Sequence, residues 1–146
     1  MLVCDVYAKG EKQIFMKGLS CDLPGIYQQK NLKTVLTSVT LLDLLFSFEI
    51  PDKAIRNGIS ATAAQTGLQG RWQVLSQKPL VIADTGHNEA GIKEIVSQIK
   101  SIKYKVLHIV LGTVNDKDIS SILRLLPKKA IYYFCKANIP RALDTN

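Results

Sequence analysis

The sequence predicts an α/β protein, because apolar strand-like runs alternate with short amphipathic segments in its second half. Three runs have the length and composition of strands, at 80–83, 106–111 and 130–135, and the first two are expected to be buried. A shorter strand is expected at 74–76. Between the runs, apolar residues at helical spacing predict one helix through 92–99 and another over 118–126. Strands joined by helices favour a mainly parallel sheet with right-handed crossovers.

A β-hairpin is predicted at the beginning of the chain. The runs LVCDVYA and KQIFMKG flank a Gly10-Glu11 turn, and both are rich in strand-forming residues. Residues 19–26 predict a further extended segment.

Two helices are expected next. The first covers 29–48, because apolar residues recur every three or four positions, at Leu32, Val35, Leu36, Val39, Leu42 and Leu45. Pro51, a residue typical of a first helical turn, opens the second. The small polar stretch 62–70 predicts a linker, which places an expected domain boundary between 1–66 and 67–146.

Composition indicates a folded protein without membrane segments. The 146 residues are 47% hydrophobic, the apolar runs are too short to cross a bilayer, and no secretion signal is recognisable at the N-terminus. Cys4, Cys21 and Cys135 are odd in number and widely spaced, which predicts buried thiols in a reducing compartment and neither disulfides nor a metal site. We therefore expect a cytoplasmic location.

Positive charge is concentrated in the second half of the sequence. Residues 1–66 carry 7 Lys and Arg against 6 Asp and Glu, whereas 67–146 carry 12 against 6. This imbalance suggests an anionic partner, although lysines near helix ends also complement the helix dipole. The sequence lacks aromatic–basic interleaving and zinc-ligand spacing, so we expect no nucleic acid partner.

A candidate binding site follows the predicted strand at 80–83. The strand gives way to Asp84-Thr85-Gly86-His87-Asn88, and Arg71 lies a short loop away. In α/β proteins, ligands bind beyond the carboxyl ends of the strands. A carboxylate, an imidazole, an amide and a guanidinium near one such end therefore predict a ligand site.

Five segments together resemble folylpolyglutamate synthase/dihydrofolate synthase, of the Mur ligase superfamily. They occur in order along nearly the whole chain: Leu23-Pro24-Gly25-Ile26-Tyr27-Gln28-Gln29-Lys30-Asn31, Gly70-Arg71-Trp72, Asp84-Thr85-Gly86-His87-Asn88, Leu111-Gly112 with Asp116-Lys117-Asp118, and Ile139-Pro140-Arg141-Ala142. The resemblance implies that 1–66 is the tail of a central ATPase domain. It likewise implies that 67–146 is most of a Rossmann-like C-terminal domain.

The resemblance also implies a reaction. ATP phosphorylates a carboxylate of folate or dihydropteroate, and the amine of L-glutamate attacks the acyl phosphate. These are the enzymes of folate biosynthesis and one-carbon metabolism, and we expect a monomer. The sequence contains no G-x-x-x-x-G-K-[ST] phosphate loop, so the Mg²⁺ and phosphate ligands are expected outside this chain, and the chain alone is expected to be inactive.

By resemblance, ATP binds to Asn31, Arg71 and Asp84. Asp84 would accept hydrogen bonds from the ribose, with capping of the following helix as the alternative. Arg71 would contact phosphate oxygens, unless it is only a surface arginine. Asn31 would lie at the adenine or ribose, with Gln28 as a weaker member of the same site, or Asn31 would simply be a helix N-cap. Trp72 is expected to pack at the linker more than to stack on a ligand.

Four further residues have open roles. His87 is expected in the active site, as a phosphate contact or proton-transfer group, with loop hydrogen bonding as the alternative. His108, inside the apolar run, is expected in the core. Lys117 would bind the carboxylate of the incoming amino acid, or lie in a capped first turn of a helix. Arg141 is either structural or directed at a ligand.

Two other functions are compatible with these residues. One is a different Mur ligase that acts on a cell-wall precursor, and the other is a non-catalytic nucleotide-binding module with a basic face. Within the folate branch, the residues do not separate dihydrofolate synthase from folylpolyglutamate synthase.

Overall fold

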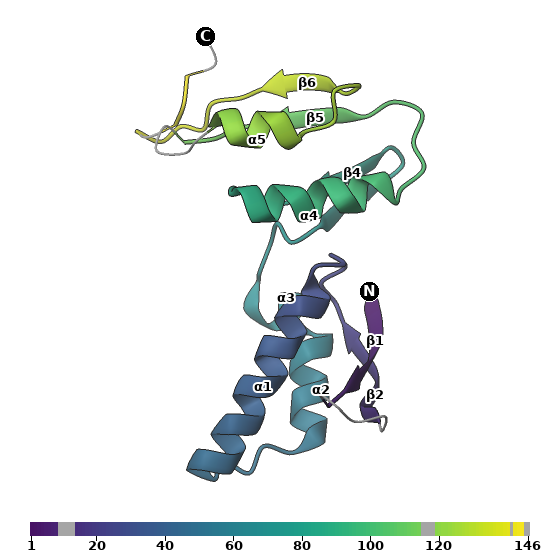
Figure 1. Ribbon diagram of the computed structural model, residues 1–146, viewed down its shortest axis with the longest axis vertical. Helices are drawn as coiled ribbons and strands as arrows, with labels where there is room; N and C mark the ends of the chain where they lie inside the picture. Colours follow the sequence, from purple (N-terminus) through teal and green to yellow (C-terminus); the bar gives the residue numbers. More distant parts are fainter. Residues whose placement is uncertain (9–13, 115–118, 141, 145–146) are drawn as a thin grey trace. The chain divides into compact units, whose positions relative to one another are not determined.

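The computed structural model describes residues 1–8, 14–114, 119–140 and 142–144 (Figure 1). The chain forms two compact units, Met1–Thr85 and Gly86–Asn146. In chain order the elements are β1 Leu2–Tyr7, β2 Ile14–Cys21, α1 Gln28–Phe46, α2 Asp52–Ser60, α3 Thr62–Thr66, β3 Gln73–Gln77, β4 Leu80–Ala83, α4 Glu89–Lys100, β5 His108–Leu111, α5 Ile119–Leu125 and β6 Ile131–Phe134. The α/β class is confirmed, and the expected domain boundary between 66 and 67 stays a prediction.

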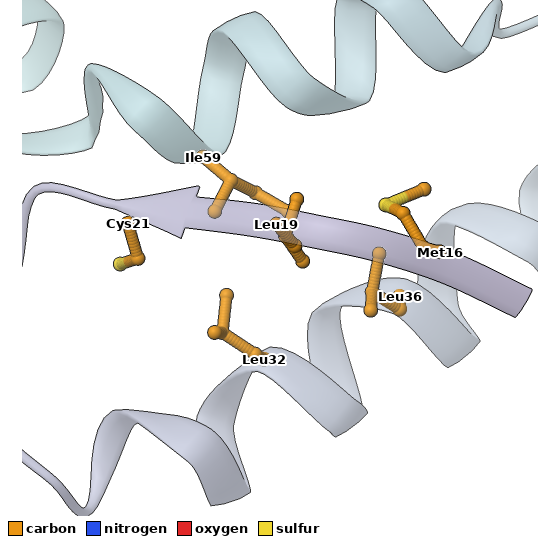
Figure 2. Close-up of a cluster of buried hydrophobic side chains, with 6 residues drawn as sticks. All are labelled: Met16, Leu19, Cys21, Leu32, Leu36 and Ile59. Atoms are coloured by element: carbon orange, nitrogen blue, oxygen red, sulfur yellow. The ribbon is translucent and has the colours of Figure 1, made fainter. Parts of the chain in front are cut away.

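The first unit has its core between a hairpin and two helices. Strands β1 and β2 pair antiparallel, and α1 and α2 lie beside them (Figure 1). The core side chains come from β2, α1 and α2 and point toward one another in Figure 2: Met16, Leu19, Cys21, Leu32, Leu36 and Ile59. Alternate β1 residues pack against this cluster while Val3 and Tyr7 are exposed, the pattern of a sheet with one buried face.

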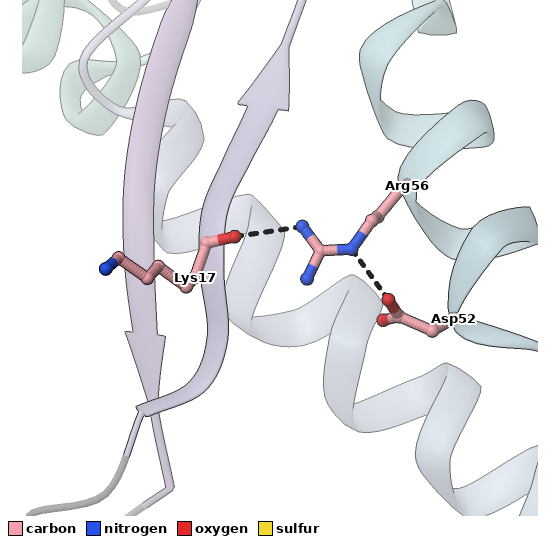
Figure 3. A network of polar contacts seen from close by, with 3 residues as sticks. All are labelled: Lys17, Asp52 and Arg56. Atoms are coloured by element: carbon pink, nitrogen blue, oxygen red, sulfur yellow. Dashed lines mark hydrogen bonds and ion pairs between the residues drawn. The ribbon is translucent and has the colours of Figure 1, made fainter.

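A polar network also joins α2 to β2 (Figure 3). The Arg56 Nε donates to Asp52 Oδ2 at 2.7 Å, one helical turn away, and its Nη1 donates to the Lys17 carbonyl at 2.9 Å. An exposed ion pair of this kind contributes at most about 1 kcal/mol. Its geometry nevertheless fixes the guanidinium over the edge of the hairpin.

Two details of the segments around the first core differ from the prediction. No separate strand covers 19–26, because residues up to Cys21 continue β2. The expected linker contains the short helix α3, whose first amides at Ala63 and Ala64 donate to Asp22 Oδ2 at 2.8 and 3.3 Å. A distant carboxylate thus caps a helix that the local composition did not suggest.

The predicted stripe of α1 is buried only in part. Leu32 and Leu36 lie in the core, but Leu42 and Leu45 are exposed, as are Leu44 and Phe46. Periodicity therefore located the helix correctly and overestimated the length of its buried face.

Strand β4 pairs with β3 in an antiparallel hairpin, with Gln73 opposite Ala83. Leu80 and Val81 are 48% and 42% exposed, so the prediction of a buried strand is wrong for this part of β4. The two strands are adjacent in sequence and joined by a turn at 78–79, which favours this local pairing.

The second unit contains the parallel pair. Strand β5 runs parallel to β6, with Leu111 opposite Phe134, as expected for strands joined through a helix. Helices α4 and α5 pack together through Ile92, Val96 and Ile122, and Leu111 and Tyr132 lie against this core.

The cysteines differ in accessibility. Cys21 is buried, as predicted, whereas Cys4 is half-buried and Cys135 is exposed, so the prediction of three buried thiols is wrong for those two. None of the helices in the described part of the chain combines the length and apolarity that a membrane crossing requires.

Candidate ATP-binding site

The β3–β4 hairpin brings the Gly-Arg-Trp turn beside the end of β4. Antiparallel pairing places the residues before β3 next to those after β4, and three hydrogen bonds continue the ladder there. The Thr85 amide and hydroxyl donate to the Gly70 carbonyl at 2.9 and 3.1 Å, and the Trp72 amide donates to Asp84 Oδ2 at 2.8 Å. Arg71 and Asp84, 13 positions apart, thus belong to one local structure.

The backbone of this turn depends on two left-handed residues. Gly70 has a φ of 68°, and a Cβ at this position would overlap the Thr85 Cγ2 methyl. Trp72 has a φ of 54°, which costs a non-glycine residue roughly 1–2 kcal/mol. Its side chain is only 5% exposed, so burial and the amide bond to Asp84 offset that cost. The packing role expected for Trp72 agrees with this burial.

Arg71 is half-buried beside Thr85. Its Nη1 donates to the Thr85 hydroxyl and, at 3.4 Å, to the Gly70 carbonyl. These contacts hold the guanidinium against the loop that follows β4. The phosphate contact expected for Arg71 stays a prediction, with a surface arginine as its alternative.

The Asp84 carboxylate receives two donors from different parts of the first unit. Besides the Trp72 amide, the Tyr27 hydroxyl donates to Oδ2 at 2.7 Å. Burial is the main reason why the pKa of Tyr27 is raised, the Asp84 hydrogen bond and charge raise it further, and the nearby Arg71 opposes the shift. Asn88 caps α4, with its Oδ1 accepting from the Gly91 amide at 2.8 Å, so the helix-cap alternative for Asp84 is wrong.

Asn31 lies in the first turn of α1 and is not its N-cap, because Tyr27 occupies that position. Its Nδ2 donates to Gln28 Oε1 at 2.7 Å, and Gln28 is only 4% exposed. Residues four positions apart share a helix face. Asn31 therefore lies on the same face as Tyr27, whose hydroxyl donates to Asp84.

The remaining predicted residues belong to the second unit or lie outside the described residues. His87 is exposed and belongs to the second unit. His108 is exposed on β5, with Nδ1 3.0 Å from the Tyr133 hydroxyl oxygen and its ring stacked on the Tyr133 ring, so its predicted core location is wrong. Lys117 and Arg141 lie outside the described residues.

The cluster contains a carboxylate and a guanidinium, two groups whose chemistry suits a nucleotide. A carboxylate has about four acceptor positions on its two oxygens, so it can hold structural donors and ligand hydroxyls together. A guanidinium fork suits phosphate oxygens. Within the described ranges, His, Cys, Asp and Glu side chains form no group suited to a metal ion.

Sequence reasoning missed Tyr27 and Thr85 as partners of the site. The contact between Tyr27 and Asp84 joins residues 57 positions apart, so a local sequence pattern does not predict it. Gly25 was the available signal: a Cβ there would lie 2.8 Å from two Tyr27 ring carbons, so glycine is needed where this ring packs.

Comparison with known proteins places the chain in a family. The model of the Mur ligase glutamate ligase domain matches residues 70–146. Escherichia coli dihydrofolate synthase/folylpolyglutamate synthase is 31% identical over 108 residues, which cover 73% of this chain and 24% of that protein. The chain thus spans about a quarter of the length of this relative.

Solved structures agree. Mycobacterium tuberculosis folylpolyglutamate synthase complexed with ADP and AMPPCP superposes with a TM-score of 0.73 at 28% identity, over 88% of this chain and 28% of that one. A bifunctional folylpolyglutamate synthase/dihydrofolate synthase with Mn, AMPPNP and L-glutamate bound gives a TM-score of 0.61 at 30% identity, over 90% and 30%. The chain belongs to the Mur ligase family and carries its glutamate ligase domain.

Proposed function

We propose that the chain works as part of an ATP-dependent ligase that adds L-glutamate to folate or dihydropteroate. Support comes from relatives named as folylpolyglutamate or dihydrofolate synthases and from solved relatives that hold ADP, ATP analogues and L-glutamate. These names favour the folate branch over a ligase for cell-wall precursors.

The observation that carries the proposal is that hydrogen bonds hold Arg71 and Asp84 next to each other. Asp84 is held by the Trp72 amide at 2.8 Å, and Arg71 by the Thr85 hydroxyl next to it. In the proposed site, the Asp84 carboxylate accepts bonds from the ribose hydroxyls and the Arg71 guanidinium donates to phosphate oxygens. Both groups are positioned before the nucleotide arrives, which reduces the entropy cost of binding.

Other residues receive roles by the same proposal. Asn31 contacts the adenine or ribose side of ATP, His87 meets the phosphate or the reacting groups, and Lys117 binds the carboxylate of the incoming glutamate. The magnesium ion and the β- and γ-phosphates need ligands that this sequence does not supply, since it lacks the phosphate loop. We therefore expect no ligation by the chain alone. We also propose that the full enzyme is a cytoplasmic monomer.

Two assays test the proposal. The first titrates ATP into the chain and follows Trp72 fluorescence, because this residue is the only tryptophan and adjoins Arg71. We expect saturable quenching or enhancement, and a signal that stays flat to millimolar ATP would count against the site. The second assay measures ADP release with ATP, folate and glutamate. ADP release by the chain alone at a rate typical of enzymes would contradict the expected inactivity.

A basic nucleic-acid-binding module is the competing class. Oligonucleotide binding that falls steeply between 50 and 200 mM salt, at roughly the slope of several phosphate contacts, would favour that module. We expect no such binding.

A further inference from the structure

The hydrogen bond between Tyr27 and Asp84 is not needed to close the hairpin. Strands β3 and β4 are already joined through their own ladder and through the Gly70–Thr85 bond. Tyr27 instead comes from the start of α1 and reaches Oδ2 of Asp84 at 2.7 Å, the oxygen that also accepts the Trp72 amide at 2.8 Å. Two donors from separate segments therefore fix one carboxylate.

The approach of Tyr27 is also built into the loop that precedes α1. Gly25 is buried, and a Cβ there would lie 2.8 Å from Cε1 and Cζ of the Tyr27 ring and 3.2 Å from its hydroxyl oxygen. Any larger residue would push the ring from its place. Glycine at position 25 thus leaves the space that the Tyr27 ring occupies.

We infer that Tyr27 is a positioning residue of the nucleotide site, whose hydroxyl holds the Asp84 carboxylate in the orientation that receives the ribose hydroxyls. The inference rests on the proposed ATP function and adds a residue to it. Tyr27 acts through Asp84 and needs no contact with ATP. Because Asn31 lies one turn further along the same face of α1, the bond also sets the start of this helix relative to the end of β4.

The test compares two nucleotides on two variants. Tyr27→Phe removes the hydroxyl and keeps the ring. Tyr132→Phe is the matched control, because Tyr132 also donates a phenol hydrogen bond, to the Pro127 carbonyl at 2.6 Å, in the second unit. Each protein is titrated with ATP and with 2′,3′-dideoxy-ATP, which lacks both ribose hydroxyls.

We expect Tyr27→Phe to weaken ATP binding by about 5- to 30-fold and dideoxy-ATP binding less than about twofold, with both affinities unchanged in Tyr132→Phe. Gly25→Ala, which displaces the ring, should give the same selective loss. An equal loss for both nucleotides, or no loss for either, would overturn the inference.

A second readout separates this inference from the proposed function. If the wild-type chain binds neither nucleotide, the ATP function fails, and NMR of the free protein decides the role of Tyr27. Positioning predicts that Tyr27→Phe shifts the Asp84 carboxyl carbon and the Trp72 amide proton, since both belong to the same hydrogen-bonded group. Resonances that match those of the wild type would show that Tyr27 does not orient Asp84.

Discussion

The Tyr27 hydroxyl donates to the Asp84 carboxylate at 2.7 Å, across 57 positions of the chain. This bond joins the start of α1 to the end of β4. Two of the segments that resemble folate ligases therefore meet at one carboxylate inside the first unit. A hydrogen bond to a charged group contributes roughly 1.5–3 kcal/mol, enough to influence the local conformation of a loop.

Replacing Asp84 should weaken ATP binding. The Asp84→Ala variant removes the acceptor for the ribose and leaves Tyr27 without its partner, so we expect a loss of about 1–3 kcal/mol in binding free energy. Isothermal titration with ATP measures it. Asp52→Ala is the control, because it removes an exposed carboxylate from an ion pair with Arg56 elsewhere in the unit. Equal affinities of wild type and Asp84→Ala would show that Asp84 does not bind the nucleotide.

The first unit should lose stability in alkaline solution through Tyr27. Its pKa is raised in the folded state from a reference of 10.0, so the protonated phenol contributes stability that is complete below pH 10 and lost as pH rises above it. Urea unfolding followed by Trp72 fluorescence, between pH 8 and about 11.5, measures this change. The stability advantage of wild type over Tyr27→Phe should shrink with rising pH. A constant difference across that range would mean that the pKa of Tyr27 is not raised on folding.

The core of the first unit should depend strongly on Leu19. This side chain is fully buried between β2 and the helices, so Leu19→Ala should lower the unfolding free energy by about 2–5 kcal/mol. Leu44→Ala is the matched control, because Leu44 is 74% exposed, and its effect should stay within about 0.5 kcal/mol. Comparable losses for both variants, in urea unfolding, would place Leu44 in a packed interface.

The cap of α4 can be tested separately. Asn88 accepts from the Gly91 amide at 2.8 Å, so Asn88→Ala should destabilise the helix start by about 1 kcal/mol. Hydrogen exchange of the Gly91 amide should then be faster by about fivefold. Asn88→Ser keeps an acceptor and should retain most of the protection. If Asn88→Ala left the exchange rate unchanged, Asn88 would not act as the cap.

Local patterns predicted most elements but not their partners. The strand at 80–83 was located at its observed bounds, and the helix predicted through 92–99 lies within α4. Helix α3 was missed because its cap, Asp22, lies 41 positions away. The exposure of Leu80 and of His108 likewise depends on which elements cover them, and a single sequence does not encode that directly.

In the candidate site, too, local patterns identified residues but not their long-range partners. Arg71 and Asp84 were chosen from their types and from the end of a strand, and the structure brings both to one loop. The third partner, Tyr27, depends on the packing of a distant helix start. Its role could not be predicted from spacing, because its contact with Asp84 spans 57 positions of the chain.

Chemical-shift mapping with ADP tests the central claim most directly. The ¹⁵N-labelled chain would be titrated with ADP, a ligand of solved relatives, to millimolar concentration. We predict saturable shifts concentrated at 27–31, 70–72 and 84–87, with the Trp72 amide among the largest. Saturable shifts concentrated elsewhere, or none at these residues, would contradict a nucleotide site built around Arg71 and Asp84.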